Sequence, residues 1–250
     1  MTGRLNGKTA VITGGTSGLG LETAKHYIAE GARVVVTGSN PQKIDTAVAS
    51  LGNQAVGILA DVRSRVEMAA LAERVKDQFG GLDILFANAG LGNFVPVSHA
   101  SEEAFDTQFD VNVKCVFNTV QALVPLMSKG GSVILNASGV HGKGMAGGSI
   151  YFATKAAVRS FARSFAAEFG EAGIRVNSLS PGLVMTPFME RTGNSAEELD
   201  GFGAQVVGIA PLNRLGQPEE VAKAAVFLAS DESSYMTASD VVVDGGFMNV

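Results

Sequence analysis

Short runs of apolar, often β-branched residues alternate with longer helical segments along the whole chain, and this alternation limits the folds that the sequence can adopt. The apolar runs predict strands at residues 8–13, 32–37, 55–60, 82–86, 130–138, 174–180 and 240–243. Helical patterns are found at residues 21–30, 41–51, 63–79, 102–127, 151–173 and 218–230. Such alternation is typical of an α/β protein with a doubly wound (Rossmann) parallel sheet of seven strands and helices on both faces. A ligand would bind at the carboxyl ends of the strands.

The length of 250 residues is compatible with one large domain or two small ones. Since no linker, repeat or low-complexity stretch divides the chain, we predict a single domain over residues 1–250. Residues 187–212 have no clean helical or strand period. We expect a mobile lid with a short helix there.

The composition indicates a globular protein rich in tight turns, with 46% hydrophobic residues, 17% charged residues and 31 glycines. A net charge of −5 without a basic block argues against nucleic acid or an anionic membrane as the partner. No run approaches the roughly 18 apolar residues that would span a membrane, and no long apolar stretch of a signal peptide is present. A cytoplasmic protein that binds a small molecule is the resulting prediction.

The cysteine and histidine content argues against a disulfide or a metal site in this chain. Cys115 is the single cysteine, so no intramolecular disulfide can form, and its apolar surroundings predict a buried thiol. The three histidines lie far apart without the spacing of metal ligands. We therefore predict no metal.

A glycine-rich turn joins the first strand to the first helix. Gly14, Gly18 and Gly20 form a G-x-x-x-G-x-G pattern, in which missing side chains let backbone amides and the helix N-terminus approach a pyrophosphate. A tight turn without a ligand is the alternative, but the position after the first strand favours a dinucleotide site. The candidate binding residues are Gly14, Thr16, Ser17, Gly18, Leu19 and Gly20.

The turn after the second strand would meet the adenosine ribose of such a dinucleotide. It contains Gly38, Ser39 and Asn40, with Lys43 nearby. No carboxylate in this turn would repel a 2′-phosphate, and no arginine would clamp one. We therefore predict a weak preference for NADP(H), with NAD(H) as the alternative.

Two further turns follow strands and could line the cofactor. Asp61 and Val62 follow the third strand, where Asp61 could accept from an adenine amino group. Asn88, Ala89 and Gly90 follow the fourth strand and could wall the cofactor. Ordinary turn chemistry explains either set equally well.

Tyr151 and Lys155 are four residues apart at the start of a helical segment, so their side chains would share one helix face. A cation about 4 Å from the phenolate would stabilise it by roughly 4 kcal/mol at an effective dielectric near 20, which is about 3 pK units. This would place the tyrosine pKa near neutral pH. Taken alone, the pair is more simply a packed tyrosine and a solvated lysine.

Several motifs in order make the chain resemble the short-chain dehydrogenase/reductase family over essentially its whole length. They are T-G-x-x-x-G-x-G at Thr13–Gly20, N-A-G at Asn88–Gly90, the helix asparagine Asn112, Ser138, Y-x-x-x-K at Tyr151 and Lys155, and P-G-x-V-x-T from Pro181 to Thr186. Asn112 is also a poor residue for a helix interior and suggests a local irregularity. Ala238 stands where the family usually has glycine.

The resemblance implies the catalytic residues Asn112, Ser138, Tyr151 and Lys155. Tyr151 would donate a proton to a carbonyl oxygen that Ser138 polarises, and would accept one in the oxidative direction. Lys155 would bind the nicotinamide ribose, and Asn112 would seat a water. The resemblance also implies cofactor contacts from Tyr151, Lys155, Pro181, Gly182, Val184 and Thr186.

We therefore expect an NAD(P)-dependent oxidoreductase, a ketoreductase or alcohol dehydrogenase, that interconverts an apolar ketone and a secondary alcohol. The predicted substrate pocket consists of Phe94, Val140, Met145, Phe188 and Phe202. The family resemblance implies a homotetramer across the helices at 102–127 and 150–173 and across the last strand. Small residues such as Ala153, Ala156, Ala157, Ala162 and Ala166 would permit close helix contact; core packing alone is the alternative explanation for them.

Three alternatives remain. The same residues could reduce a 3-oxoacyl thioester on a carrier protein, which a basic docking patch would favour, or oxidise a sugar or steroid. A nucleotide-sensing protein without turnover is the third, and it is disfavoured because all four catalytic residue types are present.

Overall fold

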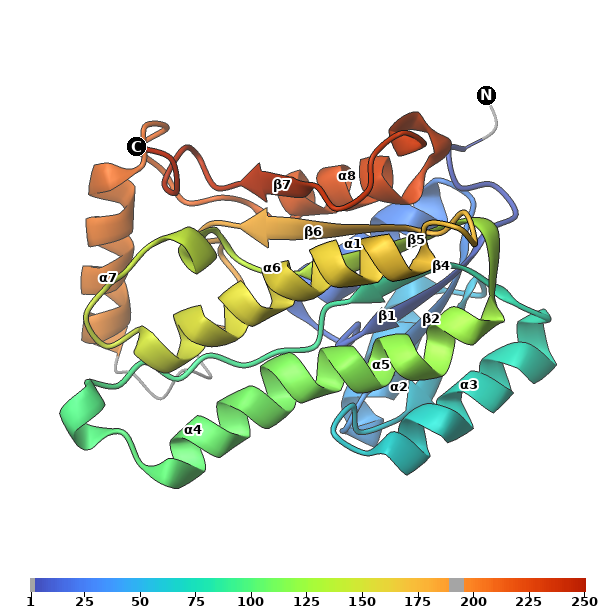
Figure 1. The fold of residues 1–250 in the computed structure, drawn as a ribbon, viewed down its shortest axis with the longest axis horizontal. Helices are drawn as coiled ribbons and strands as arrows, with labels where there is room; N and C mark the ends of the chain where they lie inside the picture. The colour runs from blue at the N-terminus through green and yellow to red at the C-terminus, as the bar shows by residue number, and fades with distance from the viewer. Residues whose placement is uncertain (1–2, 189–195) are drawn as a thin grey trace.

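The computed structural model describes residues 3–188 and 196–250, without the side chains of residues 196, 198–200 and 202. One seven-stranded sheet runs through these residues in the order β3-β2-β1-β4-β5-β6-β7, and neighbouring strands are parallel (Figure 1). The strands are β1 Thr9–Thr13, β2 Arg33–Gly38, β3 Ala55–Leu59, β4 Leu82–Ala87, β5 Met127–Asn136, β6 Arg175–Pro181 and β7 Asp240–Val243. The predicted single-domain doubly wound fold is confirmed.

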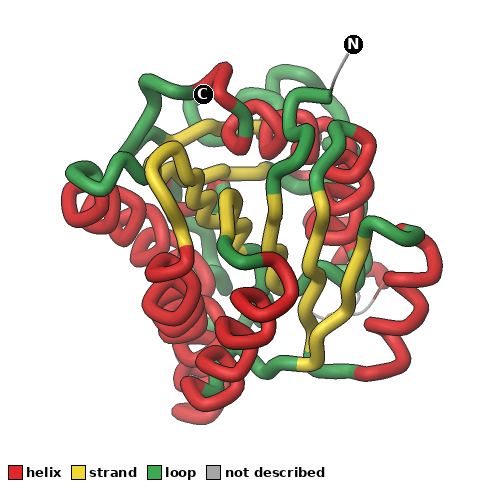
Figure 2. Tube along the Cα trace, turned by 90° about the vertical axis from the view of Figure 1, so that its right-hand side faces the viewer, coloured by secondary structure: helices red, strands yellow, loops and turns green. Residues whose placement is uncertain are grey.

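Helices cover both faces of the sheet, as the view along it shows (Figure 2). One apolar cluster joins the sheet to α3 (Arg65–Phe79), α5 (Cys115–Leu123) and α6 (Ser149–Phe169). A second cluster joins the opposite face to α1 (Gly18–Ala29), α2 (Pro41–Leu51) and α8 (Pro218–Ala229). The inner strands are therefore buried on both sides, which explains why they appear in the sequence as continuous apolar runs, whereas the edge strands β3 and β7 are only partly buried.

Alternate residues of a strand divide between the two clusters. Val11 of β1 and Val35 of β2 belong to the cluster under α3, α5 and α6. Ala10 and Ile12 point to the other face and belong to the cluster under α1 and α8. This two-residue period fixes the register of β1 against β2, because a shift by one residue would exchange the two cores.

The helix predicted at 102–127 is a composite. It consists of α4 (Glu102–Phe109), a π-helical turn η2 (Asp110–Lys114), α5, and a short 3₁₀ turn η3 (Val124–Leu126) that leads into β5. The irregularity expected at Asn112 is thus a π-helical turn. Such insertions are frequent at functional sites.

The region 187–212 contains a longer helix than predicted. Helix α7 spans Ala196–Ile209, and it stands at the carboxyl-terminal edge of the sheet in Figure 1. Residues 189–195 of the predicted lid lie outside the described residues. The helix predicted to start at residue 151 begins at Ser149 and ends at Phe169, shortly before Gly173, whose φ is +71°.

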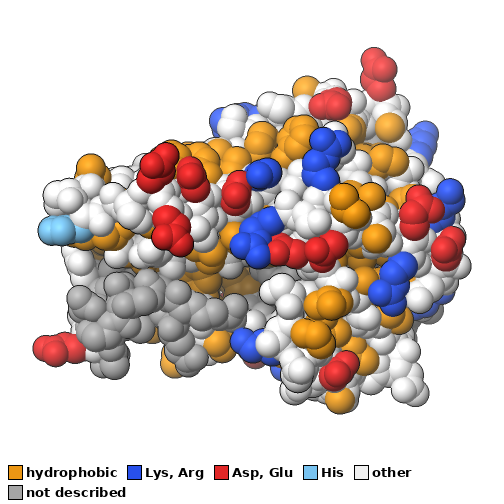
Figure 3. All heavy atoms as spheres, turned by 90° about the horizontal axis from the view of Figure 1, so that it is seen from below, with side chains coloured by type: hydrophobic (Ala, Val, Ile, Leu, Met, Phe, Trp, Pro, Cys, Tyr) orange, Lys and Arg blue, Asp and Glu red, His pale blue; other side chains and the backbone are white. Residues whose placement is uncertain are grey.

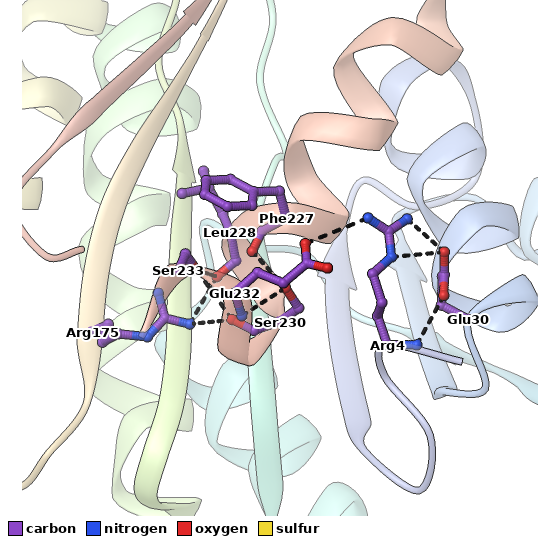
Figure 4. Close-up of polar contacts among 8 residues, drawn as sticks. All are labelled: Arg4, Glu30, Arg175, Phe227, Leu228, Ser230, Glu232 and Ser233. Atoms are coloured by element: carbon purple, nitrogen blue, oxygen red, sulfur yellow. Dashed lines mark hydrogen bonds and ion pairs between the residues drawn. The ribbon is translucent and has the colours of Figure 1, made fainter. Parts of the chain in front are cut away.

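A buried arginine closes the amino-terminal edge of β6. Arg175, which is 9% exposed, donates to the main-chain oxygens of Leu228 at 2.9 Å and Ser230 at 3.2 Å (Figure 4). These oxygens lie at the C-terminal end of α8, where a cation also complements the helix dipole. A separate surface contact, between Arg4 and Glu30, ties the start of the chain to the end of α1.

The described part of the chain contains no helix that is both long and apolar enough to cross a membrane. The same residues contain no group of three or more side chains that could bind a metal ion. Cys115 is buried, as predicted, and burial raises the pKa of its thiol to about 12.

Candidate active site

A cavity of about 580 Å³ opens at the carboxyl ends of the strands. Its wall contains most of the residues predicted for cofactor and substrate. The predicted cofactor residues on the wall are Gly14, Thr16, Ser17, Gly18, Leu19, Gly38, Ser39, Asn40, Asp61, Val62, Asn88, Ala89, Gly90, Tyr151, Lys155, Pro181, Gly182, Val184 and Thr186. Gly20 and Asn112 stand behind the wall.

The glycine turn has the geometry that an approaching phosphate requires. Gly14 and Gly18 have φ values of +63° and +53°, which favour glycine. A Cβ on Gly20 would lie 2.4 Å from the main-chain oxygen of Gly14, so Gly20 is needed for the turn itself rather than for the wall. Since α1 begins at Gly18 without an acidic residue in its first turn, its positive end faces the cavity.

The catalytic group predicted from sequence is buried at the bottom of this cavity. Tyr151 is 8% exposed, Ser138 9% and Lys155 5%. The Ser138 side chain acts on the Tyr151 phenol and lowers its pKa, and Ser138 Oγ donates to the main-chain oxygen of Pro181 at 3.5 Å. Lys155 Nζ donates to the main-chain oxygen of Asn136 at 2.9 Å and lies 5.7 Å from the centre of the Tyr151 ring.

Burial changes the expected acidities. It raises the pKa of Tyr151, and the hydrogen bond from Ser138 offsets only part of this effect. Burial also lowers the pKa of Lys155 to about 8. The sequence estimate, which placed the tyrosine pKa near neutral, is therefore wrong in direction for the chain alone, because removal of both groups from water outweighs their interaction.

Asn112 is engaged on every side chain atom that can form a hydrogen bond. Its Oδ1 accepts from the main-chain nitrogen of Leu91 at 2.8 Å, and its Nδ2 donates to the main-chain oxygen of Leu91 and to Thr154 Oγ1. The side chain thus ties the segment after β4 to helix α6. A water molecule bound by Asn112 would therefore have to contact its main-chain groups. The π-helical turn changes the hydrogen bonding of these groups from the regular α-helical pattern.

The adenosine end of the cavity carries a mixture of polar groups. Ser39, Lys43 and Arg63 line it. Asn40 Oδ1 accepts from the main-chain nitrogen of Lys43 at 3.0 Å and caps α2. Arg63 pairs with Asp61 at 2.5 Å, and this hydrogen bond lowers the pKa of Asp61. The Asp61 carboxylate is therefore already bound, and its predicted contact with adenine remains a prediction.

Aromatic rings flank the tyrosine at the other end of the cavity. The ring centres of Phe94 and Phe188 lie 5.2 Å and 6.0 Å from that of Tyr151. Val140 also lines the cavity. Met145 does not line it but packs against the small apolar cluster that contains Val206 and Phe247, and the side chain of Phe202 lies outside the described residues. The described wall at this end is apolar.

Several residues of the described wall were not among the sites predicted from the sequence. They are Thr37, Ala60, Arg63, Leu91, Val111, Asn136, Ala137, Leu183, Val206 and Phe247. Asn136 could have been predicted from the sequence, because it is a polar residue at the carboxyl end of a buried strand, where a doubly wound sheet binds its ligand. Val206 and Phe247 could not, since they come from segments that fold back over the cavity from far along the chain.

A glycine turn that fits a dinucleotide, adjoining a buried serine, tyrosine and lysine, defines the class of nucleotide-dependent oxidoreductases. Comparison with known proteins narrows the class. The family model described as "Enoyl-(Acyl carrier protein) reductase" matches residues 14–248. The chain belongs to the short-chain dehydrogenase/reductase family, and it is an oxidoreductase of that family.

Individual relatives are similar over nearly their whole length. The chain is 43% identical to oxidoreductase asL5 of Sarocladium schorii, with 99% of this chain and 98% of that protein covered. It is 35% identical to 3-oxoacyl-(acyl-carrier-protein) reductase FabG of Thermotoga maritima, with 98% and 99% covered. A solved short-chain dehydrogenase/reductase family protein superposes with a TM-score of 0.86 at 39% identity, covering 99% of this chain and 100% of the other.

Proposed function

We propose that the chain is a ketoreductase that interconverts an apolar ketone and its secondary alcohol with NADP(H). The observation that carries this proposal is the buried Tyr151 phenol, which lines the cavity together with Ser138 and is flanked by Phe94 and Phe188. A proton donor is thus held between the dinucleotide turn and an apolar wall. A carbonyl compound that reaches this position would meet both polar groups at its oxygen.

The proton-transfer step belongs to Tyr151 and Ser138. In the reducing direction the phenol donates its proton to the carbonyl oxygen as a hydride arrives at the carbon, and the reduced nicotinamide supplies that hydride when it is bound. The Ser138 hydroxyl donates a hydrogen bond to the same oxygen and stabilises its developing charge. The raised pKa of Tyr151 keeps the phenol protonated and ready to donate at neutral pH.

Lys155 has two roles in this proposal. Its ammonium, held by the main chain of Asn136, is placed to bind the nicotinamide ribose. It also lies 5.7 Å from the centre of the tyrosine ring, where a positive charge stabilises the phenolate formed after proton transfer. The same phenolate accepts a proton in the oxidative direction.

The preference for NADP(H) rests on the adenosine end of the cavity. Ser39 and Lys43 line it, and the turn after β2 carries no carboxylate. The Asp61 carboxylate is neutralised by its pair with Arg63. A 2′-phosphate would therefore meet a hydroxyl and a cation. Lys43→Met should lower kcat/KM for NADPH and leave that for NADH nearly unchanged.

The decisive experiment is steady-state turnover of ketones, diketones and sugars with NADPH and with NADH. We expect ketone turnover with the larger kcat/KM for NADPH. Tyr151→Phe should lower kcat by about 10²- to 10⁴-fold, the usual contribution of a general acid, and should retain coenzyme binding. An enzyme that turned over no ketone, or a Tyr151→Phe variant with full activity, would refute the proposal.

Reduction of a 3-oxoacyl thioester is the second candidate, favoured by the similarity to the Thermotoga maritima reductase. A carrier protein with an acidic surface would dock on a basic patch beside the cavity, so such a patch would support thioester reduction. Figure 3 shows one face of the molecule, on which basic and acidic side chains are interspersed and do not form such a patch. Turnover of a 3-oxobutanoyl thioester, compared with a simple ketone, separates the candidates.

We also propose that the chain assembles into a homotetramer and that it acts in the cytoplasm. The support for the homotetramer is an aromatic stripe along α5 and α6, where Phe117 is 44% exposed and contacts Phe161 and Phe165. Ala153 and Ala156 lie on the exposed side of α6, whereas Ala162 is fully buried in the core. Light scattering should give four copies, and Phe117→Glu should reduce that number.

A further inference from the structure

The tail segment, which we define as residues 244–250, folds back over the substrate end of the cavity. Figure 1 shows the end of the chain beside α7, at the edge of the sheet where β6 and β7 end. On its other side the tail segment meets the loop that follows Ser138: a Cβ on Gly142 would lie 3.6 Å from Met248 Sδ. The tail segment therefore contacts two parts of the chain that surround the substrate position.

Phe247 is the residue through which the tail segment reaches the cavity. It is 2% exposed to solvent, and it lines the same cavity as Tyr151 and Ser138. Its ring belongs to a small apolar cluster with Val206 of α7 and Val140 of the loop. This cluster is separate from the two large cores on either side of the sheet. Phe247 is thus part of a cavity wall rather than of the core that holds the fold together.

Hydrogen bonds within the tail segment hold this ring in place. The Asp244 carboxylate accepts from the main-chain nitrogens of Gly246 at 2.8 Å and Met248 at 2.6 Å. Gly245 and Gly246 have φ values of +67° and +93°, which permit the tight turn between them. The turn presents Phe247 to the cavity in one orientation.

Two contacts fix the turn to its surroundings. Lys143 Nζ lies 4.8 Å from the centre of the Phe247 ring and donates to the main-chain oxygen of Val250 at 2.9 Å. On the opposite side, the main-chain nitrogen of Leu212 donates to the oxygen of Gly245 at 3.1 Å. The tail segment is therefore attached both to the loop after Ser138 (residues 139–148, which we call the substrate loop) and to the chain that leaves α7.

We propose that the tail segment is a fixed wall of the substrate pocket, in which Phe247 is a specificity-determining residue and Lys143 the positioning residue that holds it. Phe247 limits the size of the apolar group beside the carbonyl and selects ketones that fill the space between its ring and Phe94. The contact of Phe247 with the substrate rests on the proposed ketoreductase function. The attachment of the tail segment to the loop after Ser138 does not depend on that function, because it is seen in the structure.

The first test compares Phe247→Ala with wild type on 2-butanone and on the bulkier acetophenone. The larger cavity should lower kcat/KM for 2-butanone about tenfold relative to acetophenone, the effect of a few methylene groups in an apolar pocket. Phe79→Ala is the matched control, since this ring lies at the end of α3, away from the cavity, and contacts Arg33. An unchanged ratio in Phe247→Ala would overturn the role of Phe247.

A binding test needs no turnover, and it separates this proposal from the ketoreductase assignment. The chain contains no tryptophan, so Phe247→Trp introduces a single fluorophore into the wall. Acetophenone should quench this fluorescence with saturation, whereas in Phe79→Trp it should quench only in linear proportion to its concentration. Saturation without ketone turnover would support the wall and refute the ketoreductase. Linear quenching in both variants would overturn the wall.

The positioning role of Lys143 has its own test. Lys143→Met removes both the hydrogen bond and the cation–π contact, and it should raise KM for the ketone about fivefold with little change in kcat, as expected when uniform binding is lost. Lys143→Arg keeps a cation and donors, so it should restore most of the affinity. Lys223→Met on α8 is the control. An unchanged KM in Lys143→Met would overturn the positioning role.

Discussion

Asn136 Nδ2 donates a hydrogen bond to Asn88 Oδ1 at 2.9 Å, and this contact links the ends of β5 and β4. Asn88 Nδ2 in turn donates to the main-chain oxygens of Thr13 and Gly14. Lys155 Nζ donates to the main-chain oxygen of Asn136. A continuous chain of hydrogen bonds therefore connects the glycine turn to Lys155, so that the proposed cofactor site and the proposed proton donor share one support.

Asn88→Ala tests this support. It leaves two main-chain oxygens and the Asn136 carboxamide without their partner, so we expect a loss of about 2–3 kcal/mol in the free energy of unfolding. The dissociation constant for the coenzyme should rise at least tenfold. Urea denaturation and coenzyme titration measure the two effects. Asn53→Ala, in an exposed turn, is the control, and equal behaviour of the two variants would contradict the prediction.

The pH dependence of ketone reduction should report Lys155. Its pKa is lowered to about 8 by burial, whereas that of Tyr151 is raised. Reduction needs the lysine charged and the phenol protonated, so kcat/KM, which reports the free enzyme, should fall as the pH rises above about 8. As the pH rises, Lys155 loses its proton before Tyr151 does, so Lys155 sets the pH at which kcat/KM begins to fall. A pH profile that stays flat to about pH 9.5 would show that the lysine charge is not required.

The Asp240 carboxylate ties the substrate loop to β7. It accepts from His141 Nε2 at 2.7 Å and from the hydroxyls of Ser178 and Ser180 at 2.6 Å and 2.7 Å. Its burial acts to raise the pKa, but the hydrogen bonds from both serines and His141 outweigh burial, and the pKa is lowered overall. The carboxylate thus stabilises the fold in its charged form.

Asp240→Asn should therefore lower the free energy of unfolding by about 2 kcal/mol at pH 7, because an amide replaces a charged acceptor. The stability from Asp240 is present above its unfolded pKa near 4 and is lost as the pH falls through the lower folded value. Wild type should then lose more stability than the variant on acidification below about pH 4. Asp45→Asn on the surface of α2 is the control, and parallel acid curves for wild type and Asp240→Asn would contradict the mechanism.

Ala238 has a φ of +59°, in the left-handed region that disfavours residues with a Cβ. Its main-chain nitrogen donates to Val176 at 2.7 Å and its oxygen accepts from Arg159, so the surroundings hold it in this conformation. Ala238→Gly should stabilise the protein by about 0.5–1 kcal/mol, or about 2 °C in Tm for a chain of this size. Calorimetry measures this effect. A lower Tm would show that the methyl group contributes more by packing than it costs in strain.

The strands and most helices could be predicted from the sequence because their signals are local. The inner strands are buried on both faces, so they appear as contiguous apolar runs such as Val34–Val36 in β2. Boundaries were less certain: β5 begins at Met127 rather than near residue 130, and α7 is a full helix where only a short one was expected. The sparse apolar pattern of α7 follows from its position at the edge of the fold, where only Val206 is buried among its described side chains.

Most residues that line the cavity could be predicted because they stand at strand ends or in a glycine turn, and parallel strands bring those ends together. The pKa values of Tyr151 and Lys155 could not be predicted. The estimate from helical spacing placed Lys155 about 4 Å from the phenol in a moderately polar medium, whereas the structure places both groups out of water. Desolvation depends on everything packed around a group, and helical spacing contains no information about it.

The sequence by itself determined the order of strands and helices, the glycine turn, and the residue types of the proposed catalytic group. Only the tertiary structure decided that Asn136 connects Asn88 to Lys155, that Asn112 lies in a π-helical turn tied to α6, and that Phe247 lines the cavity. The physical reason is distance along the chain. Local propensity and periodicity act over a few residues, whereas the depth of a cavity and the burial of its charges depend on segments that meet only when the chain has folded.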